Sequence, residues 1–327
     1  MLNISLLRSG GVITNYQCSS QCRHCLYACS PHRPKDYLEP SLAEKIFKKI
    51  KALGCHSVHI GGGEPFLHPD KLLRIADVAR ECRMAIEYIE TNASWHQQEE
   101  HTLPLLRELI KRGVHTLLVS ISPFHNEYIP FQRTKGLIAV CHKAGMHVFP
   151  WTMDFYYELQ QLDDTITHSP EEYMKRFGKD YFQALPGKYW IHYGGRALDF
   201  FSSFFPLRSL EQILNSSSSC HELENTSHFH VDLYGNYLPG LCAGLAVHYT
   251  HLGQPLPAGN YPLLSLLYSR GTKGLYEWAH CEKGFVANKK YLNKCHLCTH
   301  IRHFLVSQKE HFPELVPEGF YSFLKNN

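Results

Sequence analysis

The chain has 327 residues, of which 44% are hydrophobic and 19% are charged. That much apolar material can bury the core of one large or two smaller domains, which excludes a disordered chain. The 33 Lys and Arg residues nearly balance the 30 Asp and Glu residues, and a formal charge of +3 gives no electrostatic surface for nucleic acid. No apolar segment approaches the roughly 20 residues that cross a membrane, and the first motif follows Met1 too closely for a signal peptide. We therefore expect a cytoplasmic protein with no nucleic-acid or membrane partner.

Twelve cysteines need an explanation in the cytoplasm, where structural disulfides are rare and clustered cysteines more often bind metal. Four of them lie within the first thirty residues and five lie after residue 219. The other three, Cys55, Cys82 and Cys141, stand alone and are expected to be small core residues. The two groups therefore mark two candidate metal sites.

The first two-thirds of the chain alternate between strand-like and helix-like segments. Strands are expected at residues 11–16, 57–60, 85–89, 114–121, 147–153 and 189–193. Helices are expected at residues 41–54, 68–83, 102–113, 134–144 and 171–177. Regular alternation predicts a parallel sheet with right-handed crossovers. About six such units fit before residue 205, too few for a closed barrel of eight.

After residue 205 the pattern changes. A serine run at residues 215–219 is typical of a linker or loop, and residues 228–238 alternate around Gly235 as in a β-hairpin. The cysteines that follow have irregular spacing, which predicts a smaller, loop-rich domain that is held together by bound metal. We therefore expect a core domain over residues 1–205 and a second domain over residues 206–327.

Three cysteines lie within eight residues on the loop after the first expected strand, at Cys18, Cys22 and Cys25. Three thiolates on one loop can hold three irons of a 4Fe–4S cluster and leave the fourth iron open, where a substrate or cofactor could bind. The alternative is a zinc site, which needs a fourth ligand that Cys29 could supply. The spacing favours the iron–sulfur cluster.

A glycine-rich turn, Gly61-Gly62-Gly63-Glu64-Pro65, ends the second expected strand. Glycines at this place let a ligand approach the backbone closely, and the Glu64 carboxylate could pair with an ammonium group. The alternative is an ordinary tight turn between a strand and a helix.

Together, and in this order, the two motifs resemble those of the radical S-adenosylmethionine (SAM) superfamily over residues 9–200. The resemblance implies an α/β fold, a partial (β/α)6 TIM-like barrel, in which Cys18, Cys22 and Cys25 bind a 4Fe–4S cluster. The amino and carboxylate groups of SAM would chelate the open iron of this cluster. The residue before the third cysteine is usually aromatic in the superfamily, and here it is His24.

The resemblance also implies where SAM binds. Residues of the glycine-rich turn would receive the methionine ammonium group, residues at the ends of later strands would hold the ribose and adenine, and Arg196 could reach the carboxylate. In chain order, the expected SAM contacts are Gly62, Gly63, Glu64, Thr91, Asn92, Ser120, Ser122 and Arg196. A capped strand end or a surface arginine is the alternative for the last five.

Tyrosine, histidine and aspartate side chains recur where strands are expected to end, and any of them could face the substrate as an acid, a base or a hydrogen donor. The candidates are Tyr128, Asp154, Tyr156 and His192. Aromatic packing at a barrel mouth is the alternative, and the sequence assigns no single catalytic residue.

The later cysteines carry a second pattern. Cys220 precedes the expected hairpin, Cys242 follows it, and Cys295 and Cys298 form a distant Cys-x-x-Cys pair. This order resembles the auxiliary-cluster domains of radical SAM proteins, the SPASM domain and its shortened twitch form. The resemblance implies one auxiliary 4Fe–4S cluster held by these four thiolates, because the further cysteines of a full SPASM domain are missing and only Cys281 is left over. A four-cysteine zinc site is the alternative.

The resemblance implies an enzyme that cleaves SAM reductively to methionine and a 5′-deoxyadenosyl radical, which then takes a hydrogen atom from the substrate. The auxiliary cluster would move electrons, and an electron donor such as flavodoxin or ferredoxin would supply them. We expect a peptide or protein side chain as the substrate, and dehydrogenation or rearrangement of a small molecule as the second choice. A non-catalytic metal-binding module is the alternative of a different class.

Overall fold

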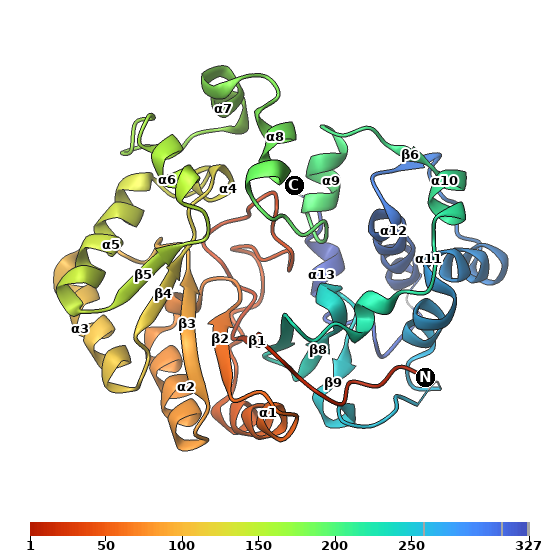
Figure 1. Cartoon of the computed structure of the whole chain (residues 1–327), viewed down its shortest axis with the longest axis horizontal. Helices are drawn as coiled ribbons and strands as arrows, with labels where there is room; N and C mark the ends of the chain where they lie inside the picture. The colour runs from red at the N-terminus through yellow and green to blue at the C-terminus, as the bar shows by residue number, and fades with distance from the viewer. Residues whose placement is uncertain (258, 309, 326–327) are drawn as a thin grey trace.

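The computed structural model describes residues 1–257, 259–308 and 310–325, and its centre is one sheet. The strands of this sheet are β1 (Gly10–Ile13), β2 (Ser57–Gly61), β3 (Ala85–Thr91), β4 (Thr116–Val119), β5 (His147–Pro150), β7 (Phe229–Asp232), β8 (Asn236–Leu238) and β9 (Val247–His248). Their order is β5-β4-β3-β2-β1-β7-β8-β9 (Figure 1). Strands β1 to β5 and β7 pair parallel, whereas β8 and β9 are added antiparallel. Because the order ends at β5 and β9, the sheet of the described residues is open.

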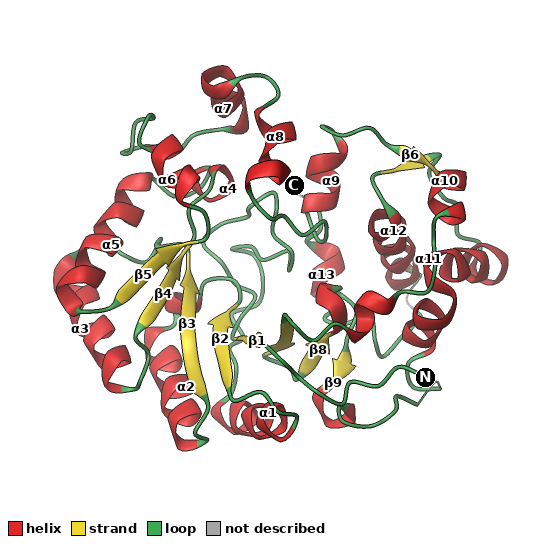
Figure 2. Ribbon diagram, viewed as in Figure 1, coloured by secondary structure: helices red, strands yellow, loops and turns green. Residues whose placement is uncertain are grey.

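Four amphipathic helices follow the first four strands and cover the outer side of the sheet (Figure 2). They are α1 (Pro40–Ala52), α2 (Pro69–Glu81), α3 (Glu99–Lys111) and α5 (Phe131–Ala144). Each turns an apolar stripe inward, as α1 does with Ala43, Ile46, Phe47 and Ile50, which recur at the spacing of one helical face.

The remaining helices are shorter or belong to the last third of the chain. Near the carboxyl ends of the parallel strands lie α4 (Pro123–Asn126), α6 (Met153–Leu159), α7 (Pro170–Phe177), α8 (Tyr181–Lys188) and α9 (Ala197–Ser202). The last third contains α10 (Leu210–Asn215), α11 (Pro262–Lys283), α12 (Lys294–Ser307), α13 (Gly319–Ser322) and a small strand pair, β6 (Arg208–Ser209) with β10 (Lys290–Tyr291). Among the described residues, no helix is long and apolar enough to span a bilayer.

The predicted α/β fold with a parallel sheet and a partial barrel is confirmed. The predicted strand at residues 189–193 is wrong, because this segment is irregular. Its consecutive side chains Tyr189, Trp190 and Ile191 line a cavity, so the apolar run does not reflect strand pairing. The sixth parallel strand is instead β7, which comes from beyond residue 205 and pairs with β1.

The last third of the chain is more helical than the sequence predicts. Helices α11 and α12 pack against each other where a loop-rich domain is expected. Within α11, Gly271 has a φ of 63° and interrupts the helical backbone. The buried positions in the middle of α11 are Gly271, Thr272 and Gly274, so the sequence shows no continuous apolar stripe there.

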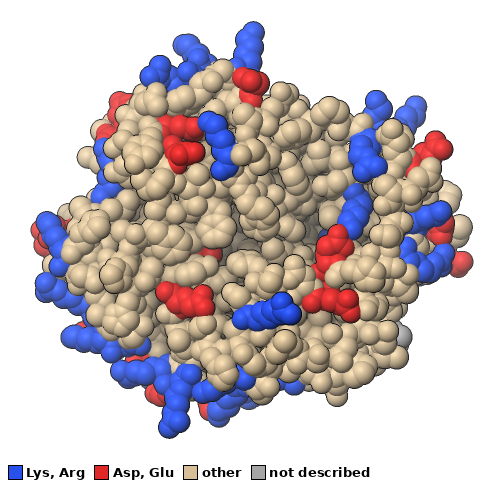
Figure 3. All heavy atoms as spheres, viewed as in Figure 1, with Lys and Arg blue, Asp and Glu red and all other residues tan. Residues whose placement is uncertain are grey.

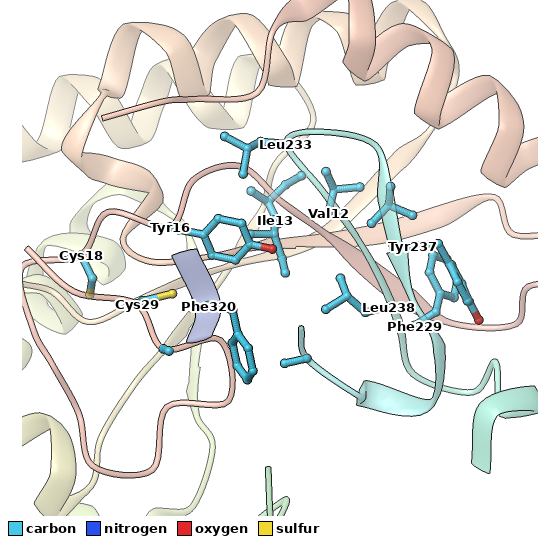
Figure 4. Close-up of a cluster of buried hydrophobic side chains, with 14 of the residues drawn as sticks. Val12, Ile13, Tyr16, Cys18, Cys29, Phe229, Leu233, Tyr237, Leu238 and Phe320 are labelled. Atoms are coloured by element: carbon cyan, nitrogen blue, oxygen red, sulfur yellow. The ribbon is translucent and has the colours of Figure 1, made fainter. Parts of the chain in front are cut away.

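The two predicted domains share one hydrophobic core. Figure 4 shows side chains of β1, β7, β8 and α13 gathered in one cluster, among them Val12, Phe229 and Phe320, each at most 2% exposed. The hydroxyl of Tyr16, which follows β1, donates a hydrogen bond of 2.9 Å to the Asp232 carboxylate at the end of β7. The division at residue 205 therefore stays a prediction, and the sheet runs through it without a break.

We expect Gly10 to be essential for the join between β1 and β7. A Cβ at this position would lie 2.2 Å from the backbone oxygen of Phe229, its register partner. Gly10→Ala should lower the free energy of unfolding by about 1–3 kcal/mol, because the strands must move apart to admit the methyl group. Gly187→Ala is the control, since nothing lies within 4 Å of a Cβ there. Thermal unfolding followed by circular dichroism measures both, and equal midpoints would contradict the expectation.

Candidate functional site

The loop between β1 and α1 carries the first cysteines to the carboxyl ends of the parallel strands. Cys18, Cys22 and Cys25 line a cavity of about 230 Å³, together with Gly62 and Gly63 from the turn after β2. Figure 3 shows that one face of the molecule is hollowed in its middle, and that most of its charged side chains lie around the rim. The cysteine loop and the glycine turn therefore meet at one site.

Gly195 and Arg196 hold the cysteine loop in place. The buried Arg196 donates from Nε to the Cys22 carbonyl at 3.0 Å and from Nη2 to the Cys29 carbonyl at 2.7 Å. Its backbone N–H donates to the Cys25 carbonyl at 3.1 Å. Gly195 has a φ of +54°, and a Cβ there would lie 2.4 Å from that same carbonyl oxygen. The Arg196 guanidinium therefore binds carbonyls of the loop and is not part of the cavity lining, and its expected contact with the SAM carboxylate stays a prediction.

The thiols of the loop fit a metal cluster. Burial raises the pKa of Cys18 to about 12 and that of Cys22 well above its usual value, because a buried thiolate loses its hydration. The hydrogen bond from Cys29 is the main cause that lowers the pKa of Cys25. The Asn92 side-chain amide lies 3.4 Å from the Cys18 sulfur as a donor. Three convergent thiols with an amide donor on one sulfur suit a 4Fe–4S cluster, whose iron would supply the positive charge that buried thiolates need.

The Glu64 carboxylate is fully buried and accepts hydrogen bonds from other groups of the protein. Its Oε1 accepts hydrogen bonds from the Phe66 N–H at 3.1 Å and the Thr91 hydroxyl at 3.0 Å, and its Oε2 accepts from the Asn92 N–H at 2.7 Å. Burial raises the pKa of Glu64 to about 7. This residue links the end of β2 to the end of β3 and is not part of the cavity lining, and its expected pairing with an ammonium group stays a prediction.

The residues expected at the ribose and adenine fall into two kinds. Thr91, Asn92 and Ser120 line the cavity. Ser122 does not, because its hydroxyl caps α4 and lies 2.7 Å from Nδ1 of His125. Ser122 therefore serves as a helix cap in this structure, and SAM binding by all four residues stays a prediction.

Of the four candidate catalytic residues, only His192 lines the cavity. Tyr128 and Asp154 are exposed on or next to the short helices α4 and α6. Tyr156 packs its ring on Phe131, with ring centroids 5.1 Å apart. The strands end earlier than the sequence predicts, and these three side chains belong to the helices beyond them.

The later cysteines meet around a second cavity of about 40 Å³. Cys220, Cys242, Cys295 and Cys298 line it. The last two lie near the start of α12, where residues three apart share one face. Cys281 is exposed near the end of α11 and is not part of this lining. The ligand set itself stays a prediction.

The two cavities are neighbours. His192 and Leu241 line both of them. The second cavity also contains a buried cation, Arg302, whose Nη1 donates to the Ala243 carbonyl at 2.9 Å. Burial raises the pKa of Cys242 to about 12, so a nearby positive charge helps to stabilise its thiolate.

Sequence reasoning missed four polar residues on the inner side of the sheet: His59 on β2, Glu90 on β3, and His228 and His230 at β7. Burial lowers the pKa of His59 to about 3 and raises that of Glu90 to about 7. His59 and Glu90 could have been noticed in the sequence, because each is a titratable residue within or directly after a predicted parallel strand. Such strands are covered on both faces and consist mainly of apolar residues.

We predict that Arg196→Gln loosens the cysteine loop. The change removes donors from buried carbonyls of Cys22 and Cys29, so the free energy of unfolding should fall by about 2–6 kcal/mol. The amount of iron bound after anaerobic reconstitution should fall as well, because the loop no longer holds the three thiols in position. Thermal unfolding and iron analysis measure the two effects.

Arg23 provides the matched control for this prediction. It belongs to the same loop and pairs with Glu127 at 2.8 Å, but its side chain is 36% exposed. Arg23→Gln should therefore cost only about 0–1 kcal/mol and leave the iron content unchanged. The assignment of Arg196 fails if both variants bind iron equally well.

Comparison with protein families gives a match to the radical SAM superfamily over residues 12–166. No curated protein is similar enough to the chain to match it. Among solved structures, the chain is similar to Streptococcus suis SuiB bound to S-adenosylmethionine, with 15% identity and a TM-score of 0.41 over 83% of this chain and 67% of that one. It is also similar to BtrN in complex with AdoMet and 2-DOIA, with 16% identity and a TM-score of 0.43 over 83% of this chain and 90% of that one.

A third similar structure is anSMEcpe with bound AdoMet and Cp18Cys peptide, with 14% identity and a TM-score of 0.45 over 92% of this chain and 97% of that one. The family match covers the cysteine loop, the glycine turn and strands β2 to β5. Residues 12–166 of this chain therefore form a domain of the radical SAM superfamily.

Proposed function

We propose that this chain is an enzyme that takes a hydrogen atom from its substrate with the help of a 4Fe–4S cluster and SAM. The observation that carries the proposal is the shared cavity lined by three cysteines, Cys18, Cys22 and Cys25, and by the glycine turn. Radical SAM domains use these two cofactors, which together supply one-electron chemistry strong enough to break an unactivated C–H bond.

The chain's own residues would bind and orient these groups. Cys18, Cys22 and Cys25 would ligate iron. The Asn92 amide lies 3.4 Å from the Cys18 sulfur, and its hydrogen bond would influence the reduction potential of the cluster. Gly62 and Gly63, which line the cavity, would lie beside the amino-acid part of SAM. The cavity walls would exclude water from the reacting groups.

We further propose that Cys220, Cys242, Cys295 and Cys298 hold a second 4Fe–4S cluster. It would exchange electrons with the substrate, and a donor such as flavodoxin or ferredoxin would supply the reductant. The shared lining of the two cavities supports this electron transfer.

Residues 1–205 would then be the catalytic core and residues 206–327 the auxiliary-cluster region. All twelve cysteines are free thiols. Free thiols in this number suit a reducing compartment, so we expect the enzyme to act in the cytoplasm.

The substrate that the cavity supports best is a peptide or protein side chain. Trp151 and Trp190 line the cavity but are 38% and 59% exposed, so aromatic surface continues outward from the site. Exposed aromatic side chains of this kind favour contacts with a large partner. Because the cavity of about 230 Å³ must also admit SAM, only a small part of a large substrate would enter it.

A small-molecule dehydrogenation or rearrangement is the second candidate. It is favoured by the polar side chains Glu90, His192 and His230, which line the cavity and could bind the hydroxyl or amino groups of a small polar substrate.

The proposal predicts that anaerobic protein with SAM and dithionite releases methionine and 5′-deoxyadenosine. Replacing Cys18, Cys22 and Cys25 together by Ala should abolish this release and remove one cluster, about four irons per chain. Iron analysis and chromatography of the products measure both effects. Stoichiometric zinc without visible absorption would instead favour a non-catalytic metal-binding module.

The second cluster has its own test. Cys295→Ala should remove up to about four irons per chain and stop product formation, while SAM cleavage without product persists, because the first cluster is untouched. Cys281→Ala is the control, since this exposed thiol lies outside the second cavity. Iron loss in Cys281→Ala but not in Cys220→Ala would show that the ligand set is wrong by one member.

A further inference from the structure

Three histidines meet on the inner side of the sheet, apart from both groups of cysteines. His59 belongs to β2, His228 precedes β7 and His230 lies on it. Each offers one ring nitrogen, and the three nitrogens all lie within 4.8 Å of one another. The Nε2 atoms of His59 and His230 lie 2.9 Å apart. In the part of the chain that the structure describes, no other group of three His, Cys, Asp or Glu ligand atoms is as close.

Gly11 makes this meeting possible. On β1, Gly11 pairs in register with His59 on one side and with His230 on the other. The two histidine backbones are therefore two strand spacings apart, about 10 Å. A Cβ on Gly11 would lie 2.3 Å from Nε2 of His59, so the ring fills the space that a side chain on β1 would occupy. The two imidazoles reach each other only across a glycine.

Neighbouring groups orient the rings. The Tyr27 hydroxyl lies 2.8 Å from Nδ1 of His230, which leaves Nε2 of that ring turned toward His59. The His59 ring stacks on Tyr88 with centroids 5.0 Å apart. Metal-binding histidines are commonly held in this way, with the second ring nitrogen bonded to an oxygen.

The surroundings suit a cation. Both rings, His59 and His230, are buried, and the neutral imidazole is the form that binds metal. Oε1 of Glu90 lies 3.8 Å from Nε2 of His59, so a carboxylate stands beside the three nitrogens.

We propose that His59, His228 and His230 bind one divalent transition-metal ion, with Zn²⁺ as the reference ion. Three imidazoles are the ligand set of zinc sites that keep a fourth position open for an oxygen ligand. His228 and His230 line the large cavity, so the open position would face the space assigned to the substrate and could bind a carbonyl, carboxylate or hydroxyl oxygen. This substrate contact rests on the proposed function, whereas metal binding by the three histidines does not.

The test uses the full chain with its iron–sulfur sites filled first by anaerobic reconstitution, so that the cysteines do not take up the probe. One equivalent of Zn²⁺ is added without SAM and unbound metal is removed. Zinc is then counted by mass spectrometry, and its ligands are identified by X-ray absorption at the zinc edge. We expect one zinc per chain with nitrogen or oxygen ligands at about 2.0–2.1 Å and no sulfur at about 2.3 Å.

His228→Phe is the main variant, because His228 is only half-buried and Phe keeps an aromatic ring at this position. It should lower the retained zinc at least about tenfold while the iron content and circular dichroism spectrum stay unchanged. His228→Gln repeats the test with a polar side chain. His125→Gln is the control and should retain zinc fully, because His125 lines the same cavity but is bonded to Ser122 at 2.7 Å.

Three results would overturn the site: no retained zinc in the unaltered chain, zinc bound only by sulfur, or equal zinc in His228→Phe. Since zinc is counted without SAM and without turnover, a failure of the proposed radical chemistry would leave this measurement unaffected. The two proposals can therefore fail separately.

Discussion

The place of β1 between β2 and β7 is the constraint on which the rest of the structure depends. Both pairings are parallel, and parallel strands present their carboxyl ends at one edge of a sheet. The cysteine loop after β1, the glycine turn after β2 and the hairpin after β7 therefore arrive at the same edge. This arrangement joins residues from both ends of the chain into one site, and it also places the second group of cysteines next to the first.

The cysteine loop has little regular secondary structure, so its buried backbone groups need partners from elsewhere. Arg196 supplies donors from its guanidinium and its backbone. The Asn15 amide donates to the Gln17 carbonyl at 2.8 Å and to the Glu64 carbonyl at 3.1 Å, which links the loop to the glycine turn. These hydrogen bonds offset the free-energy cost of burying the polar backbone of the loop. They also hold the thiols in their positions. The same hydrogen bonds therefore stabilise the loop and set the geometry of the site.

The interior of the site opposes charge on its own side chains. Burial raises the pKa of Cys18 to about 12 and that of Glu90 to about 7, and it lowers the pKa of His59 to about 3. In each case the low-polarity surroundings disfavour the ionised form. A cation bound in such a place stabilises nearby thiolates and carboxylates, and neutral imidazoles are ready to ligate it without losing a proton. A cation would therefore bind here only where such ligand atoms offset the loss of its hydration.

Elements with local signals could be predicted from the amino-acid sequence alone. The helices α1, α2, α3 and α5, the strands between them and the hairpin at Gly235 all follow from periodicity and turn residues, and the short spacing of Cys18, Cys22 and Cys25 keeps them on one loop. Other features could be seen only in the folded chain. Strand β7 completes the row of parallel strands, and His59 meets His230 across a glycine. Glu64 and Arg196 form hydrogen bonds with backbone groups. The physical reason is that periodicity encodes which face a residue presents, whereas the partners across that face depend on strand order, which no local segment specifies.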